Sequence, residues 1–345
     1  MKAILKAKPA PGAVLSELPD PKPRHGELLI QVHRASICGS DLALYNWNSW
    51  APGRVKTPLM FGHEFCGTVL SCGPGADGFK AGDFVSVESH IYCDRCLQCR
   101  LGQRHVCADM KLTGVDAPGG FGEFAVIPAR VAWRHRTGAL RDMGSLFEPF
   151  GNAVYSVSVE DVKDQIVLVL GAGPQGLFAI AVAKALGARR VVVVEGSKFR
   201  GSLAEKMGAD AVVKPDGAGT LAKALKAAKR PEGYDVVLEL SGNPEAAAMS
   251  LKAVRAGGRI TAFGLPGRPV EVDWAHDLIF KGLRVYGIIG RRIWETWEQA
   301  DALLESGAVD LRPVVTHVLP LRDFKEGFRL MMSPEKNCGK VVLVP

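Results

Sequence analysis

The sequence predicts an α/β protein with two domains, one rich in β-strands and one built on a doubly wound parallel sheet. The chain has 345 residues, about twice the length of a typical domain. From about residue 151 onward, apolar runs typical of buried strands alternate with Ala-, Leu- and Lys-rich segments typical of helices. Before that point, short alternating runs lie between Gly and Pro residues, a pattern typical of a compact β-rich domain.

Each expected strand is a short apolar or alternating segment bounded by turn-forming residues. In the first part of the chain we expect strands at 27–37, 65–72, 83–89 and 122–128. In the second part we expect strands at 165–171, 190–195, 210–214, 234–240, 258–264 and 284–289.

Composition argues against a nucleic-acid partner and against a membrane protein. The net charge is 43 − 36 = +7, but the basic residues are scattered. The densest group (Lys223, Lys226, Lys229 and Arg230) has helical spacing and is typical of a solvated helix face. No run of 18 apolar residues occurs, and the N-terminal MKAILKAKPAPG has no signal-peptide pattern. We therefore expect a cytoplasmic location, where lasting disulfides are rare.

Four of the eight cysteines fall within CDRCLQCRLGQRHVC, at positions Cys93, Cys96, Cys99 and Cys107. A disulfide across so short a loop would contribute only about 2 kcal/mol. A four-cysteine zinc site is worth roughly 10–16 kcal/mol in small peptides and needs no oxidant. Because the segment is charged and poor in large apolar residues, we predict a structural zinc that takes the place of a core. Free surface thiols and an iron–sulfur cluster are the weaker alternatives.

A second candidate metal site combines Cys38, His63 and Glu64. The sequence HEFCG has Gly67 where a helical HExxH metalloprotease needs a second histidine. One sulfur, one imidazole and one carboxylate form a mixed three-ligand set. Such a set is typical of a catalytic zinc with one open position.

A glycine pattern follows the first apolar run of the second domain. Gly171, Gly173 and Gly176 form G-x-G-x-x-G between an expected strand and an expected helix, the arrangement that binds the pyrophosphate of a dinucleotide. Glu195 ends the next strand, where a carboxylate accepts hydrogen bonds from the ribose hydroxyls of NAD and repels a 2′-phosphate. Arg200 lies close enough in sequence to soften that preference. The sequence therefore favours NAD over NADP.

These motifs, together with YNWNSW (45–50), ESHIYC (88–93), EPFGNAV (148–154) and GIIGRRIWETW (287–297), give the chain a clear resemblance. It resembles the zinc-dependent medium-chain alcohol dehydrogenases over essentially its whole length. Within that superfamily it is most similar to the threonine 3-dehydrogenase branch.

The resemblance implies a GroES-like catalytic domain at 1–150, to which 298–345 returns, and a Rossmann domain at 151–297. It implies a catalytic zinc on Cys38, His63 and Glu64 and a structural zinc on the four clustered cysteines, hence two zinc ions per chain. It gives Glu148 the role of transient ligand or relay group, and Ser40 that of the hydroxyl that takes the alcohol proton; a helix N-cap is the alternative for Ser40. The cofactor contacts it implies, beyond the glycines, are Gln175, Glu195, Arg200, Phe263, Gly264, Leu265, Ile288 and Ile289. Such enzymes are commonly homotetramers.

Three departures from the branch bear on the reaction. Ala43 replaces a relay histidine, Asn48 replaces an aspartate between the two tryptophans, and Tyr155 stands where a histidine is common. Three functions therefore remain open: oxidation of L-threonine to 2-amino-3-oxobutanoate, oxidation of a polyol or another secondary alcohol, and cofactor binding without turnover in a redox sensor. Candidates for contact with the substrate, chosen by charge and segment, are Glu88, His90, Arg291 and Arg292, of which His90 is the one we select.

Overall fold

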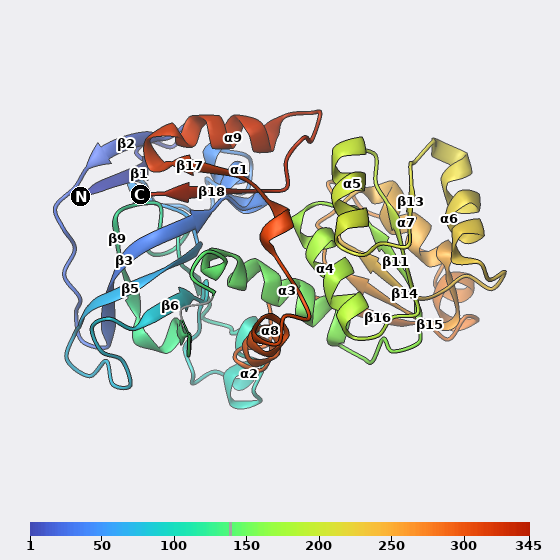
Figure 1. Ribbon diagram of the computed structural model, residues 1–345, viewed down its shortest axis with the longest axis horizontal. Coiled ribbons are helices and arrows are strands. Elements are labelled where there is room, and N and C mark those ends of the chain that lie inside the picture. The colour runs from blue at the N-terminus through green and yellow to red at the C-terminus, as the bar shows by residue number, and fades with distance from the viewer. Residues whose placement is uncertain (138–139) are drawn as a thin grey trace. The chain divides into compact units, whose positions relative to one another are not determined.

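The computed structural model describes residues 1–137 and 140–345. Internal contacts divide these residues into two compact units (Figure 1). Unit 1 comprises Met1–Pro149, Val315–Pro334 and Lys340–Pro345, and unit 2 comprises Phe150–Val314 and Glu335–Gly339. Unit 2 thus continues beyond residue 297, because α8 (Glu295–Glu305) belongs to it. The domain limits drawn from the sequence stay predictions.

Unit 1 is built mainly on a mixed sheet with the order β10-β6-β5-β3-β18-β17, and β9 also pairs with β3. Its neighbouring strands are antiparallel except for β17 and β18, which are parallel. The strand β3 occupies the middle of this sheet, and its side chains alternate between buried and less buried positions, as expected for a strand with one face on a core. The C-terminal strand β18 pairs with β3, so the two ends of the chain share one sheet. A smaller sheet has the order β2-β1-β4, and β7 pairs with β8.

Unit 2 contains a parallel sheet with the order β13-β12-β11-β14-β15-β16 among the described residues. The central strand β11 reads IVLVL and is buried at every position, as expected where helices cover both faces. Helices α4 and α5 contact one another, and so do α6 and α7 (Figure 1). The order, which reverses at β11, is that of a doubly wound dinucleotide-binding sheet. The predicted fold class is confirmed.

The strands and helices have the following bounds. The strands of unit 1 are β1 (Lys2–Lys6), β2 (Val14–Glu17), β3 (Glu27–Ser36), β4 (Leu59–Met60), β5 (Glu64–Cys72), β6 (Phe84–Val87), β7 (His90–Ile91), β8 (Lys111–Leu112), β9 (Phe124–Pro128), β10 (Ala132–Arg134), β17 (Val315–Pro320) and β18 (Lys340–Val344). Those of unit 2 are β11 (Ile166–Leu170), β12 (Arg190–Val194), β13 (Ala211–Val213), β14 (Tyr234–Glu239), β15 (Val254–Ala262) and β16 (Arg284–Gly287). Besides α8, the helices are α1 (Gly39–Tyr45), α2 (Leu97–Arg100), α3 (Phe147–Ser158), α4 (Pro174–Ala185), α5 (Lys198–Lys206), α6 (Thr220–Ala228), α7 (Pro244–Ala253) and α9 (Phe324–Met332).

Every strand expected from the sequence is present, with shifts at some ends. The segment expected at 83–89 ends as a strand at Val87, because the chain then turns into the separate β7. The segment expected at 284–289 ends at Gly287, so Ile288 and Ile289 follow the strand. Among the described residues, no helix is long and apolar enough to cross a membrane.

Candidate metal centres and cofactor site

Unit 1 brings Cys38, His63 and Glu64 together. Cys38 is the N-cap residue of α1, and Glu64 begins β5 directly after His63. One ligand atom from each residue lies within 4.8 Å of the others, and His63 and Glu64 are buried. A set with one sulfur, one nitrogen and one oxygen donor at this spacing fits a zinc ion that keeps an open position for substrate.

Asp41 supports two of these three residues. Its Oδ2 accepts a hydrogen bond from the backbone N–H of Cys38 at 2.9 Å. Its Oδ1 lies 3.4 Å from Nδ1 of His63, and neither atom has a hydrogen-bond partner among the residues the structure describes. A carboxylate at Nδ1 leaves Nε2 of His63 as the metal-binding atom, because histidine ligands are commonly oriented through their second nitrogen.

Glu64 is held by a buried lysine. The ammonium of Lys340 donates to Oε1 at 2.7 Å, bonds Oε2 as well, and donates to the carbonyl of Ile37 at 3.0 Å. The hydroxyl of Ser36 also donates to Oε2. Burial opposes the charged form of Lys340, yet the adjacent Glu64 carboxylate raises the pKa of that lysine above its usual value. Lys340 therefore stays cationic beside the metal ligands.

Ser40 and Glu148 were predicted to act beside this metal site. Ser40 lies in the first turn of α1, with its Oγ 3.5 Å from Nε2 of His63. It is not the N-cap, since Cys38 occupies that position, so the alternative for Ser40 was wrong. Glu148 is buried in the first turn of α3, and its charge helps to raise the pKa of Glu64 after the larger effect of burial. Their catalytic roles stay predictions.

The predicted substrate residue His90 belongs to a buried tripeptide with Glu88 and Ser89. Oε1 of Glu88 accepts from the backbone N–H of His90 at 2.8 Å and lies 2.9 Å from its Nδ1. The hydroxyl of Ser89 donates to Oε1 of Glu148 at 2.6 Å. Ligand atoms of Glu88, His90 and Glu148 also lie within 4.8 Å of one another. Glu88, Ser89, His90 and Glu148 therefore form one buried polar cluster in unit 1.

The four-cysteine segment forms a compact cluster. The sulfurs of Cys93, Cys96, Cys99 and Cys107 lie within 4.8 Å of one another, and all eight cysteines, which fall within the described residues, are free thiols. A tetrahedral zinc with Zn–S bonds of about 2.3 Å places its sulfurs about 3.8 Å apart, and the sulfurs of Cys96 and Cys107 are 3.8 Å apart.

Local hydrogen bonds favour the thiolate form at Cys96, whereas burial raises the pKa of the Cys99 and Cys107 thiols, which a bound zinc ion would have to deprotonate. The backbone N–H groups of Cys93 and Cys96 donate to sulfurs of the cluster at 3.3 Å. Backbone N–H groups at Cys99 and Ala108 lower the pKa of Cys96 to about 6. Leu97 and Leu101 are 57% and 63% exposed, so the segment has no apolar core of its own. The donor set and its surroundings fit a structural zinc.

The glycine-rich turn of unit 2 fits a bound pyrophosphate. Gly171 has φ +89°, which favours glycine, and a Cβ on Gly176 would lie 1.9 Å from the carbonyl oxygen of Gly171. A Cβ on Gly173 would meet only the Arg200 guanidinium, at 4.0 Å, so the turn is open there. Gly173 is the N-cap residue of α4, and Pro174 occupies its first turn. The buried Oε1 of Gln175 has no hydrogen-bond partner within residues 1–137 and 140–345, as expected of a group that hydrogen-bonds to a bound ligand.

Glu195 and Arg200 lie beside that turn. Glu195 follows β12, and its carboxylate accepts from the backbone N–H of Ala172 at 2.7 Å and of Ser197 at 2.8 Å. Arg200 lies in α5 and donates from Nε to the carbonyl of Cys338 at 3.0 Å. The carboxylate thus braces the glycine turn in addition to its predicted contact with ribose.

The remaining predicted cofactor residues follow strands β15 and β16. The backbone N–H groups of Phe263 and Gly264 both donate to the carbonyl of Glu239 at 3.0 Å, and a Cβ on Gly264 would lie 2.2 Å from a backbone nitrogen. Leu265 and Ile289 are exposed, whereas Ile288 is buried. The structure places these residues after the C-terminal ends of parallel strands, where open α/β sheets bind ligands.

The structure also shows the positions of the residues that differ from the pattern of the threonine 3-dehydrogenase branch. Asn48 Oδ1 accepts from the backbone N–H of Trp50 at 3.1 Å, a contact that an aspartate would make equally well. Ala43 lies in α1, three residues after Ser40. In unit 2, the guanidinium of Arg292 lies 5.3 Å from the centre of the Tyr155 ring, and Arg291 is buried and donates to Asn152.

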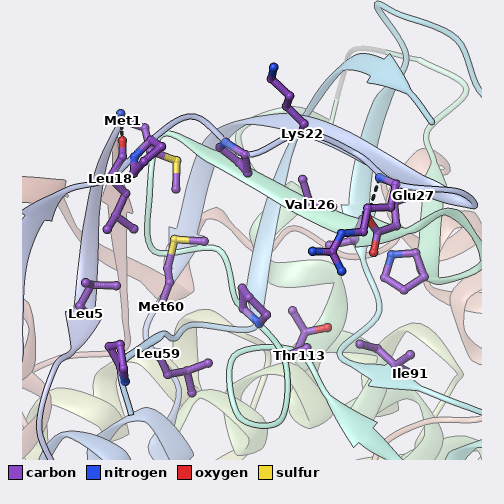
Figure 2. A pocket seen from close by; sticks show the side chains of 18 residues that line it. Met1, Leu5, Leu18, Lys22, Glu27, Leu59, Met60, Ile91, Thr113 and Val126 are labelled. Atoms are coloured by element: carbon purple, nitrogen blue, oxygen red, sulfur yellow. Dashed lines mark hydrogen bonds between the residues drawn. The ribbon is translucent and has the colours of Figure 1, made fainter. Parts of the chain in front are cut away.

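A cavity of about 580 Å³ lies elsewhere in unit 1 (Figure 2). It is lined mainly by apolar side chains, among them Leu5, Leu59, Met60 and Ile91, and Lys22 and Glu27 are at its edge. None of the described residues in the two metal-ligand clusters lines it. We do not assign the reaction to this cavity, because the candidate metal ligands lie elsewhere in unit 1.

Sequence reasoning missed several residues of the site: Ser36, Asp41, Ser89 and Lys340. Asp41 had a local signal, since it stands three residues after Cys38, the spacing of a capping box. Lys340 had no such signal, because 276 residues separate it from Glu64.

The family matches agree with this geometry. Residues 24–136 match the family described as "Alcohol dehydrogenase GroES-like domain", and residues 174–306 match "Zinc-binding dehydrogenase". The chain therefore belongs to the zinc-binding alcohol dehydrogenases with a GroES-like domain. The predicted family is confirmed.

Individual proteins of known sequence or structure are similar to this chain over its whole length. Over its whole length the chain is 45% identical to the L-threonine 3-dehydrogenase of Bacillus velezensis and 46% identical to that of Pyrococcus abyssi, covering 99% and 98% of those proteins. An alcohol dehydrogenase from Escherichia coli CFT073, solved with NADH, matches with a TM-score of 0.91 and 26% identity over 100% of this chain and 99% of that one. A zinc-binding dehydrogenase from Sinorhizobium meliloti 1021, bound to NADP, matches with a TM-score of 0.91 and 27% identity over the same shares.

Proposed function

We propose that the protein oxidises the 3-hydroxyl group of L-threonine to 2-amino-3-oxobutanoate, with NAD as the hydride acceptor and zinc as the catalytic metal. The observation that carries this proposal is the cluster of Cys38, His63 and Glu64 in a chain 45% identical over its full length to an L-threonine 3-dehydrogenase.

The residues of unit 1 would have the following roles in the reaction. Cys38, Nε2 of His63 and Glu64 would hold zinc, which when bound polarises the alcohol oxygen and lowers its pKa so that the carbon can release hydride to the nicotinamide. Asp41 would keep the His63 ring oriented. Ser40 would accept the alcohol proton, and Glu148 would act beside the metal as a transient ligand or relay group. Because Ala43 has no acceptor atom, we propose that the proton passes from Ser40 to water.

Acceptor groups in unit 1 suit a substrate that carries an ammonium group. We propose that His90 and Glu148, whose ligand atoms lie within 4.8 Å of one another, receive this group. An ammonium offers only hydrogen-bond donors, whereas a polyol hydroxyl offers both a donor and acceptors. A hydroxyl can also donate to these acceptors, but the positive charge of an ammonium would make a stronger hydrogen bond with the Glu148 carboxylate, which favours the hydroxy amino acid over the polyol.

Two finer assignments concern the bound groups. We propose NAD rather than NADP because Glu195 places a carboxylate beside the glycine turn, where it would repel a 2′-phosphate. We propose two zinc ions per chain, one catalytic and one on the four cysteines, since each donor set fits zinc. The reduced thiols of both clusters suit a reducing compartment, and we place the enzyme in the cytoplasm.

We propose that the enzyme assembles as a homotetramer. Unit 2 supports self-association through a group of exposed apolar side chains, namely Trp274, Ile279, Phe280 and Val285. Val285 belongs to β16, which is the last strand of the parallel sheet among the described residues, and an edge strand can pair with a further strand. Light scattering of the wild type and of Val285→Lys tests this: a tetramer that the substitution dissociates supports it, and a monomeric wild type contradicts it.

A substrate panel tests the proposed reaction. Initial rates of NADH formation should be measured with L-threonine, a 2,3-diol and a linear polyol at equal concentrations, on zinc-loaded protein. We expect the highest kcat/KM for L-threonine. A higher value for either neutral alcohol would assign the polyol function, and NADH binding without turnover of any alcohol would favour a redox sensor.

A further inference from the structure

The ammonium group of Lys340 has three hydrogen-bond acceptors, one for each of its N–H groups. It donates to Oε1 of Glu64 at 2.7 Å, to Oε2 of the same carboxylate, and to the carbonyl of Ile37 at 3.0 Å. A neutral amine has only two N–H groups and would direct a lone pair at one of these acceptors. The geometry therefore holds Lys340 as a cation, and its side chain is only 3% exposed.

Lys340 contacts two of the three candidate zinc ligands at their supports. Besides the Glu64 carboxylate, it bonds the peptide group that joins Ile37 to Cys38, because the carbonyl of that group is its third acceptor. The N–H of the same peptide group donates to Oδ2 of Asp41 at 2.9 Å. The peptide is thus held between a cation and an anion, and hydrogen bonds linked in this way strengthen one another.

A positive charge at this position weakens the ligand set as a donor. Cys38 as a thiolate, Glu64 and Asp41 carry three negative charges around a site that fits a divalent ion. Lys340 pairs with both oxygens of the Glu64 carboxylate. A carboxylate that shares its charge with a cation is a weaker metal ligand, so more of the positive charge of the metal remains to act on a bound alcohol.

We propose that Lys340 is a positioning residue that keeps the Glu64 carboxylate a weak metal ligand, so that zinc is bound less tightly and activates the substrate hydroxyl more strongly. This inference rests on the proposed function, because it concerns the same zinc site. It also bears on Ala43. Since that residue has no acceptor atom, a substrate hydroxyl made more acidic compensates in part for the missing proton acceptor.

The first test measures zinc affinity without substrate or cofactor. In Lys340→Met the Glu64 carboxylate has lost its cation, and we expect the Kd for zinc at this site to fall by at least about tenfold. A variant whose site was merely distorted would bind zinc more weakly, as is usual when the supports of metal ligands are changed. Competition with a chelator, followed by elemental analysis, gives the Kd, and the ion that Cys38→Ala lacks identifies the site.

The second test measures turnover, which should change in the opposite direction. With zinc at saturation, we expect the kcat of Lys340→Met for L-threonine to fall about 10- to 100-fold, with a smaller change in KM. The isotope effect on kcat with C3-deuterated L-threonine should rise, because hydride release becomes slower relative to the other steps. Tighter zinc together with slower chemistry is a result that a purely structural role of Lys340 would not give.

Two matched variants separate charge from orientation. Lys340→Arg keeps the cation and should bring both the Kd for zinc and the kcat back toward the wild-type values. Ser36→Ala removes a neutral hydrogen bond to Oε2 of Glu64 but leaves the cation in place, so its effects on both quantities should be much smaller. Equal effects of Ser36→Ala and Lys340→Met would overturn the proposal, because orientation and not charge would then be the cause.

Unchanged or weaker zinc binding in Lys340→Met would also overturn it. Should that variant fail to fold, Lys340→Gln, which is neutral but keeps a hydrogen-bond donor, must show the tighter zinc binding instead. A wild type that does not oxidise L-threonine would contradict the proposed function, while chelator competition would still decide the effect of Lys340 on zinc.

Discussion

The ammonium of Lys340 and the carboxylate of Glu64 form a buried ion pair, with Nζ 2.7 Å from Oε1 and in contact with Oε2 as well. Both side chains are no more than 3% exposed. Ser36 also donates to Oε2, so this oxygen has hydrogen bonds for both of its lone-pair directions. Glu64 would therefore hold a metal ion while its carboxylate stays paired with Lys340.

Removal of the lysine charge should make the fold more dependent on zinc. In Lys340→Met the metal-free protein keeps a buried carboxylate without its cation, and loss of one partner of a buried pair typically costs about 3–5 kcal/mol. Bound zinc would supply the missing positive charge. We therefore expect zinc to raise the free energy of unfolding more in Lys340→Met than in the wild type, as measured by urea denaturation with and without zinc.

Lys340→Arg serves as the matched control, because it keeps the charge beside Glu64. Equal unfolding free energies for metal-free wild type and metal-free Lys340→Met would contradict this account of the pair.

The four-cysteine cluster should hold one of two zinc ions. Cys93→Ser combined with Cys96→Ser removes two of four thiolate ligands, and we expect elemental analysis to fall from two zinc ions per chain to one. Because the segment has no apolar core, the variant should also unfold at a lower temperature. Cys72→Ser is the control, because this thiol lies outside both clusters and donates to the carbonyl of Phe79 at 3.5 Å, and the variant should keep both ions. A single zinc in the loaded wild type would refute the two-site assignment.

The features that the sequence predicted best are those whose partners lie close in the chain. The four clustered cysteines and the Gly171–Gly176 turn each lie within 15 residues of sequence, so their spacing alone predicts their geometry. The alternation of apolar and helix-forming segments in unit 2 reflects a repeated strand–helix–strand connection. The pairing of β18 with β3 and the contact of Lys340 with Glu64 join residues about 300 positions apart. Nothing local in the sequence indicates these contacts, because they arise only when the two chain ends form one sheet.

Glu195 should control the choice between NAD and NADP. Glu195→Ala removes a charge that would oppose a 2′-phosphate by about 4 kcal/mol at a surface-like dielectric, while Arg200 remains to meet that group. We expect the ratio of Kd for NADPH to Kd for NADH, measured by fluorescence titration, to fall by at least about tenfold. NADH should also bind more weakly, because Glu195 braces the backbone of Ala172.

The exposed Glu205 of α5 is the control, and Glu205→Ala should leave both constants unchanged. A wild type that binds NADPH and NADH equally well would contradict the role of Glu195.

His135 should make unit 1 less stable in acid. Burial lowers its pKa to about 4, below the usual value of 6.5, so the folded state resists a proton that the unfolded state takes up. The free energy of unfolding should therefore fall as the pH decreases below about 6.5, by about 2 kcal/mol between pH 7 and pH 5. Urea denaturation of zinc-loaded protein at the two pH values measures this loss.

The same comparison with two substitutions isolates the histidine. His135→Gln should lose that part of the pH dependence, whereas His25→Gln, at an exposed position, should keep it. If the wild type and His135→Gln lose equal stability between pH 7 and pH 5, the buried imidazole does not cause the effect.

In the proposed reaction, hydride leaves C3 of L-threonine for the nicotinamide in an enzyme that depends on the Cys38, His63 and Glu64 zinc. The most direct measurement uses L-threonine deuterated at C3 and determines the mass of the reduced cofactor by mass spectrometry. We expect one deuterium per molecule of NADH formed, and no reduced cofactor from Cys38→Ala that has lost one zinc ion. NADH without deuterium, or formation of labelled NADH by protein that lacks the metal at this site, would contradict it.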